Sequence, residues 1–146
     1  MMKVGILGGS FDPFHKGHFG VAKYTQAELN LDLVLLMCSK CSPFKNGITS
    51  TSFTDRLNMV KLYNEDSIKA TAFEQIRFPQ QDIVYSVECL KKYKSLHPDH
   101  IVYYIMGQDS FNKIEFYRDY EWLFDKNNVY LVVYGRPNYE QSENKY

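Results

Sequence analysis

The sequence predicts an α/β protein built on a doubly wound parallel sheet of about five strands. Apolar runs of strand length alternate along the chain with longer segments of helical periodicity, and most of these runs contain few polar residues. Such strands are usually covered by helices on both faces of a parallel sheet, and β-α-β alternation implies right-handed crossovers. The 146 residues are expected to form one domain, residues 1–146.

Five short apolar runs supply the predicted strands. They are Lys3–Leu7, Leu33–Cys38, Ile68–Phe73, Ile101–Met106 and Val129–Tyr134. The predicted helices are Gly17–Leu29, Ser52–Glu65, Ile83–Leu96 and Asp109–Phe124, the last of them broken. In the first helix Val21, Tyr24 and Ala27 fit an amphipathic register, and Ser52 or Thr54 is expected to cap the second. This alternation indicates a Rossmann-like sheet, with ligands bound beyond the carboxyl ends of its strands.

Composition excludes several classes of protein. Lys and Arg together number 17, as do Asp and Glu, so the net charge of +0 argues against a broad nucleic-acid or membrane surface. No apolar run approaches the roughly 18 residues of a membrane span. Three cysteines do not make a disulfide framework, so a reduced, cytoplasmic protein is expected. The pairs Cys38/Cys41 and His97/His100 lie too far apart in sequence for zinc-finger spacing, and no metal site is predicted.

A glycine turn followed by two histidines stands near the start of the chain. The segment Val4–His18 reads V-G-I-L-G-G-S-F-D-P-F-H-K-G-H. Gly8 and Gly9 allow a sharp turn and a close approach of the backbone to a ligand. His15 and His18 would share one face of the first helical turn, whose free N–H groups and positive dipole end suit phosphate. The segment therefore predicts a phosphate-binding site.

This pattern resembles the G-G-[ST]-F-D-P-x-H-x-G-H signature of the H-x-G-H nucleotidyltransferase superfamily. It is neither a Walker loop nor a G-x-G-x-x-G motif. Later segments are similar to motifs of bacterial nicotinate-nucleotide adenylyltransferases, in the same order and over essentially the whole chain. Those segments are Ser42–Lys45, Asp55–Met59, Tyr85–Leu90, Ile105–Asp109, Tyr117–Tyr120 and Gly135–Asn138.

The resemblance implies transfer of the adenylyl group of ATP to nicotinate mononucleotide, with Mg²⁺ held mainly by the ATP phosphates. It implies that His15 and His18 are the catalytic pair. The implied ATP-binding residues are Gly8, Gly9, Ser10, Phe11, His15, His18 and Lys45. The implied acceptor-binding residues are Ser10, Lys45, Tyr85, Ser86, Gly107, Asp109, Tyr117 and Arg136, and Tyr117 would stack on the pyridine ring.

Several of these residues also fit purely structural roles. Lys45 could be a solvated side chain, Tyr117 a core aromatic and Arg136 a turn residue. Ser86 and Asp109 stand where helix caps are expected, although a capping Asp at a site can also orient a substrate.

The sequence departs from the family pattern at its end. Family members continue past the R-P-G region and carry an I-S-[ST]-T-x-[IV]-R element whose helix binds the ATP phosphates. This sequence ends at Tyr146 without that element, so the expected sheet is C-terminally short. Two alternatives therefore stay open: another small nucleotidyltransferase, of the phosphopantetheine adenylyl or glycerol-phosphate cytidylyl type, or a truncated, non-catalytic nucleotide-binding protein. A homo-oligomer is a further option, because the shortened chain could expose apolar surface.

Overall fold

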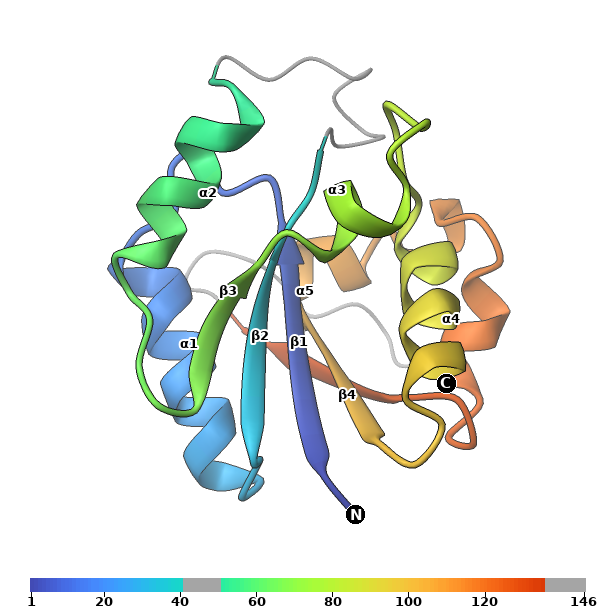
Figure 1. Cartoon of the computed structure of the whole chain (residues 1–146). Coiled ribbons are helices and arrows are strands. Elements are labelled where there is room, and N and C mark those ends of the chain that lie inside the picture. The colour runs from blue at the N-terminus through green and yellow to red at the C-terminus, as the bar shows by residue number, and fades with distance from the viewer. Residues whose placement is uncertain (41–50, 136–146) are drawn as a thin grey trace.

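The computed structural model describes residues 1–40 and 51–135, and within them the strands form one parallel sheet (Figure 1). The strands are β1 (Lys3–Gly9), β2 (Leu33–Cys38), β3 (Ile68–Thr71), β4 (Ile101–Gly107) and β5 (Tyr130–Tyr134). Their order across the sheet is β3-β2-β1-β4-β5, and every neighbouring pair is parallel. The predicted doubly wound α/β fold and its five strands are confirmed.

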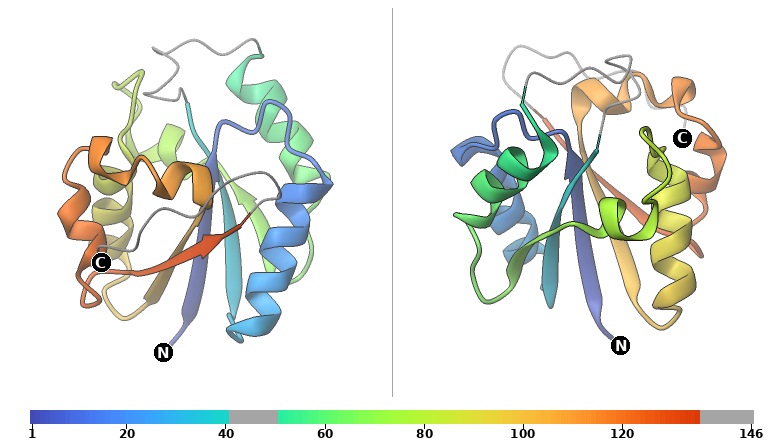
Figure 2. Two further views of the ribbon diagram at one scale, coloured as in Figure 1. Left: turned by 180° about the vertical axis from the view of Figure 1, so that it is seen from behind. Right: turned by 45° about the horizontal axis from the view of Figure 1, so that its top comes forward.

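Helices cover both faces of the sheet. They are α1 (Lys16–Glu28), α2 (Phe53–Lys61), α3 (Phe73–Arg77), α4 (Ser86–Leu96) and α5 (Gln108–Phe111), followed by the 3₁₀ helices η2 (Ile114–Phe116) and η3 (Tyr120–Phe124). Helices α1 and α2 lie on one face, and α4 and η3 lie on the other (Figure 2). Within the described residues, no helix is long and apolar enough to cross a membrane.

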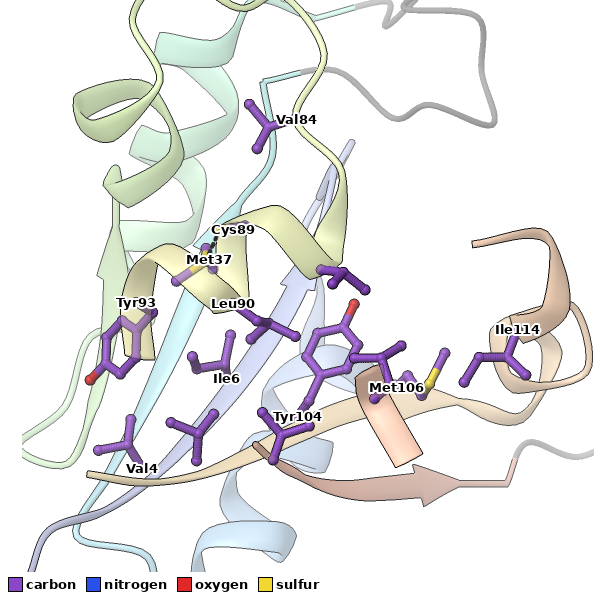
Figure 3. Close-up of a cluster of buried hydrophobic side chains, with 14 residues drawn as sticks. Val4, Ile6, Met37, Val84, Cys89, Leu90, Tyr93, Tyr104, Met106 and Ile114 are labelled. Atoms are coloured by element: carbon purple, nitrogen blue, oxygen red, sulfur yellow. Dashed lines mark hydrogen bonds between the residues drawn. The ribbon is translucent and has the colours of Figure 1, made fainter. Parts of the chain in front are cut away.

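Alternation along the strands divides the core between the two faces. On the α4 face, Val4 and Ile6 of β1 pack with Leu90 and Tyr104 (Figure 3). On the α1 face, Leu7, the residue after Ile6, joins a second cluster around α1 and α2. Because every second residue of a strand points to the same face, strands covered on both faces need apolar residues throughout.

Most element boundaries differ from the sequence prediction by one to four residues, and the predicted helix Asp109–Phe124 is divided into α5, η2 and η3. The third strand ends at Thr71 rather than Phe73, because Phe73 begins the short helix α3. The predicted helix from Ser52 ends at Lys61. The predicted helix Ile83–Leu96 begins only at Ser86. Ser52 is confirmed as a cap, because its side chain accepts a hydrogen bond from Asp55 N at 3.2 Å.

The strand order places a crevice beside β1. The chain leaves β1 for β2 on one side, whereas β4 pairs with β1 on the other side, so the winding direction reverses between β1 and β4. In open α/β sheets, ligands bind beyond the carboxyl ends of the strands at this switch point. Gly9 ends β1 and Gly107 ends β4, which brings two of the predicted site segments to that crevice.

Candidate active site

The two histidines form a capping box at the start of α1, in which each side chain accepts a hydrogen bond from a backbone N–H. His15 is the N-cap of α1, and its Nδ1 accepts a hydrogen bond from Gly17 N at 3.1 Å. His18 Nδ1 accepts a hydrogen bond from His15 N, also at 3.1 Å. A Cβ at Gly17 would meet the His15 ring at 2.9 Å, so a larger residue there would displace that ring. This reciprocal arrangement fixes both side chains at the start of the helix.

These hydrogen bonds also fix the chemistry that the imidazoles offer. A nitrogen that accepts from a backbone N–H carries no proton, so the neutral tautomer of each ring holds its proton on Nε2. The two rings are stacked with centroids 3.8 Å apart, and the His18 ring also contacts the rings of Phe11 and Phe14. His15 and His18 therefore each carry an Nε2–H donor near a helix N-terminus, an arrangement suited to an anionic ligand.

The histidines open into a pocket of about 470 Å³, here called the histidine pocket. Its walls come from the glycine turn, from α1 and from the end of β4, and its polar lining includes Gly8, Gly9, Ser10, Asp12, His15, His18, Gly107, Asp109, Ser110, Tyr117 and Tyr134. At Gly107 a Cβ would lie 2.7 Å from Asp109 Oδ1 and 3.3 Å from the Tyr134 ring. Glycine at this position therefore lets the carboxylate and the phenol close over the strand end.

A second pocket, here called the apolar pocket, continues from the same glycine turn. It measures about 200 Å³. Ile6, Met37, Val84, Cys89 and Leu90 give it apolar walls, while Ser39, Glu74, Ser86, Tyr104, Ser110 and Tyr117 add polar groups. Both pockets share Gly8, Gly9, Ser10, Tyr104, Ser110 and Tyr117. An anion-binding end thus meets a compartment with aromatic and aliphatic walls.

Arg56 holds the loops around this junction. Its side chain is 1% exposed and donates to the carbonyl oxygens of Ser10, Ser39 and Lys40 at 2.7 Å each and of Thr51 at 3.0 Å. One buried cation therefore ties the β1 turn to the end of β2 and to the entry of α2. A buried guanidinium with several hydrogen-bonded partners is a strong local constraint, because removing it leaves those carbonyls unsatisfied.

The structure brings most of the sequence-predicted residues together. Ser86, Gly107, Asp109 and Tyr117 line one or both pockets, as do all the residues of the glycine turn and both histidines. Tyr85 lines neither pocket; Arg118 lies over its ring, 3.8 Å from the centroid. Lys45 and Arg136 lie outside the described residues.

Burial shifts the ionisation of the groups at the junction. Burial raises the pKa of Tyr104, whose phenol is hydrogen-bonded with Ser86, and burial also raises the pKa of Tyr117, which is hydrogen-bonded with Ser110. Both tyrosines are therefore neutral hydrogen-bonding groups at physiological pH. Glu74 differs: burial raises its pKa to about 7, against the opposing effect of the Lys40 backbone N–H that donates to it.

Arg56 and Glu74 were not predicted as site residues. Arg56 stands within a helical pattern beside buried Leu57 and four residues before buried Val60, and a charged residue on such an apolar face is a signal of burial. Glu74 carried no comparable signal, because it lies in the five-residue helix α3 that the sequence reading placed partly in a strand. Among the described residues, no group of three or more His, Cys, Asp or Glu side chains could hold a metal ion.

Comparison with known families agrees with this geometry. The family model described as "Cytidylyltransferase-like" matches residues 6–145. The chain belongs to this family. Fold similarity extends to Plasmodium falciparum nicotinic acid mononucleotide adenylyltransferase complexed with NaAD, with a TM-score of 0.80, 21% identity, and coverage of 98% of this chain and 69% of that one.

Two curated family relatives are similar in sequence over most of this chain. One, from Shewanella sp. (strain MR-7), is 38% identical over 97% of this chain and 65% of its own length. Another, from Citrifermentans bemidjiense, is 35% identical over 90% of this chain and 60% of its own length. Both bear the name "Probable nicotinate-nucleotide adenylyltransferase". The chain thus spans less than two thirds of the length of these relatives.

Proposed function

We propose that this cytidylyltransferase-like protein transfers the adenylyl group of ATP to nicotinate mononucleotide, forming nicotinate adenine dinucleotide and pyrophosphate. The observation that carries the proposal is the pair of Nε2–H donors that His15 and His18 present at the N-terminus of α1. The names of the curated relatives support the choice of adenylyl transfer and of this acceptor.

The reaction needs positioning and charge neutralisation more than proton abstraction. A phosphate oxygen of the acceptor attacks the α-phosphorus of ATP, and the bond from that phosphorus to the bridging oxygen of the β-phosphate breaks. Pyrophosphate leaves with that electron pair, and Mg²⁺ held by the ATP phosphates would help to neutralise their charge. The two imidazoles and the helix N-terminus would stabilise the negative charge on the α- and β-phosphates.

The two pockets divide the substrates in this proposal. The histidine pocket, with about 470 Å³, would receive ATP, and the apolar pocket would receive the acceptor's pyridine ring against Tyr117. Asp109 and Tyr134 close over Gly107 in the wall of the histidine pocket, where hydrogen bonds to a ribose or phosphate could form. We assign the reaction to the cytoplasm, in keeping with Cys38 and Cys89, which are free and buried.

Pyrophosphate release tests the proposal directly. The purified chain would be incubated with ATP and Mg²⁺ and one of four acceptors: nicotinate mononucleotide, nicotinamide mononucleotide, phosphopantetheine, or glycerol phosphate with CTP replacing ATP. Release with a pyridine mononucleotide, lost in His18→Ala, is the expected result. Release only with phosphopantetheine or with the CTP pair would assign the chain to another nucleotidyltransferase activity. No release from the folded protein with any acceptor would contradict catalysis by this chain.

A further inference from the structure

Glu74 is a buried carboxyl group in the wall of the apolar pocket. Its side chain belongs to the first turn of α3, and the residue is only 5% exposed. Oε1 accepts a hydrogen bond from Lys40 N at 2.9 Å, and among the described residues no hydrogen bond to Oε2 is found. Among the described residues that line this pocket, Glu74 alone carries a carboxylate or a basic group. Whatever enters the pocket therefore meets one ionisable oxygen pair among neutral walls.

Burial, opposed by nearby cations, brings the pKa of Glu74 close to neutral pH. The titratable and charged groups packed around it come from both flanking helices and two strands: Cys38, Lys40, Arg56, Glu88, Cys89 and Tyr104. Lys40 Nζ is already bonded to the carbonyl oxygens of Phe78 and Gln81, and Arg56 to four other carbonyls. Burial therefore outweighs the nearby cations and raises the pKa of Glu74 to about 7.

The pocket has the size and chemistry of an aromatic ring site. At about 30 Å³ per water, its 200 Å³ correspond to roughly seven water-sized groups, enough for a six-membered ring. Aliphatic side chains and the ring of Tyr117 supply the walls. A polar substituent on a ligand ring held between them would face the polar part of the lining. The polar part of the lining includes Glu74. A ring substituent that contacts Glu74 meets a carboxyl group, which donates a hydrogen bond when it is protonated and accepts one when it is ionised.

We propose that Glu74 selects between a carboxylate and a carboxamide on the pyridine ring of the acceptor. The inference rests on the proposed transfer to a pyridine mononucleotide. Ionised Glu74 accepts a hydrogen bond from a carboxamide N–H and repels a carboxylate, whereas protonated Glu74 donates to a carboxylate oxygen. The preference for the acid over the amide should therefore decrease as the pH rises through neutrality.

Comparing two acceptors isolates this effect from other titrations. Nicotinate and nicotinamide mononucleotide carry the same phosphate and meet the same histidines, so those ionisations cancel in the ratio of their kcat/KM values. The ratio would be measured from pH 6 to pH 8.5 for the wild type, Glu74→Gln and Glu88→Gln. Gln at position 74 keeps an oxygen for Lys40 N–H and cannot ionise. Glu88 is the matched control, because its Oε1 is occupied by Tyr85 N and Gln81 Nε2 and it lines neither pocket.

The expected result is specific to Glu74. In the wild type the acid-to-amide ratio should fall about 10-fold across this range, whereas in Glu74→Gln it should stay constant. Glu88→Gln should keep the fall but move its midpoint to lower pH, because the charge of Glu88 raises the pKa of Glu74. A pH-independent ratio in the wild type, or an unchanged pH dependence in Glu74→Gln, would overturn the role of Glu74 while leaving adenylyl transfer intact. Absence of turnover with both acceptors in every protein would overturn the proposed function and this inference together.

Discussion

The histidine pocket and the apolar pocket meet at one glycine turn but are built in different ways. The reactive side of the histidine pocket comes from one continuous segment, Gly8–His18, in which neighbouring residues hold one another through local hydrogen bonds. The apolar pocket is assembled from β1, β2, α3, α4, β4 and the segment after β4. A locally built site depends on few contacts, whereas the assembled one depends on loops that Arg56 and Glu74 hold in place. The following substitutions test that difference.

The largest expected effect comes from the local site. His18→Ala removes one of the two imidazole donors and should lower turnover at least about 100-fold, the loss typical of a positioned transition-state donor. The lost cap should cost only about 1 kcal/mol of stability. Steady-state kinetics together with thermal unfolding would check both values. His97→Ala, at the C-cap of α4 and away from both pockets, is the control, and an equal loss of activity there would remove the basis for singling out His18.

Arg56→Ala should act on the apolar pocket by lowering the stability of the loops that form it. Four backbone carbonyls lose their donor, so the free energy of unfolding should fall by about 3 kcal/mol. Urea denaturation measures this, with Arg77→Ala as the control because Arg77 is exposed at the end of α3. A change below about 0.5 kcal/mol would show that the Arg56 contacts do not constrain the loops.

Glu74 gives the stability of the protein a pH dependence. The folded pKa of about 7 lies above the ordinary value of 4.5, so the folded state binds the proton more tightly than the unfolded state. Its contribution to stability is complete below pH 4.5 and is lost as the pH rises through 7, a decrease on the order of 3 kcal/mol. Glu74→Gln should therefore gain stability relative to the wild type between pH 5 and pH 8 in urea denaturation. If the two proteins lose stability in parallel as the pH rises, Glu74 is not a buried carboxyl group with a raised pKa.

A smaller effect is expected in the wall of the histidine pocket at the end of β4. In Gly107→Ala the new Cβ would displace Asp109 and Tyr134, and kcat/KM should fall about 10-fold with little change in the melting temperature. Gly20→Ala is the matched control: nothing lies within 4 Å of that Cβ, and alanine should stabilise α1 by about 0.5–1 kcal/mol. Unchanged kinetics in Gly107→Ala would show that the histidine pocket tolerates the displacement of Asp109 and Tyr134.

The same contrast explains how far the sequence predicted this molecule. Strands buried on both faces leave apolar runs, so all five strands and the crevice at their carboxyl ends could be predicted. The phosphate-binding turn could be predicted because Gly8–His18 is contiguous. Glu74 could not be predicted, since its burial results from long-range packing of a helix too short to leave a periodic pattern. Arg56 stood in a recognised motif, but its four carbonyl partners appear only once the loops are placed.

Label transfer from ATP tests the central claim most directly. The protein would be incubated with nicotinate mononucleotide, Mg²⁺ and ATP labelled at the α-phosphate, and the products would be separated for the wild type and for His18→Ala. We expect the label in a dinucleotide, with unlabelled pyrophosphate released in equal amount, and neither product from the variant. Label that stays in ATP with the folded wild-type protein, or a dinucleotide formed equally well by His18→Ala, would contradict adenylyl transfer at the histidine pocket.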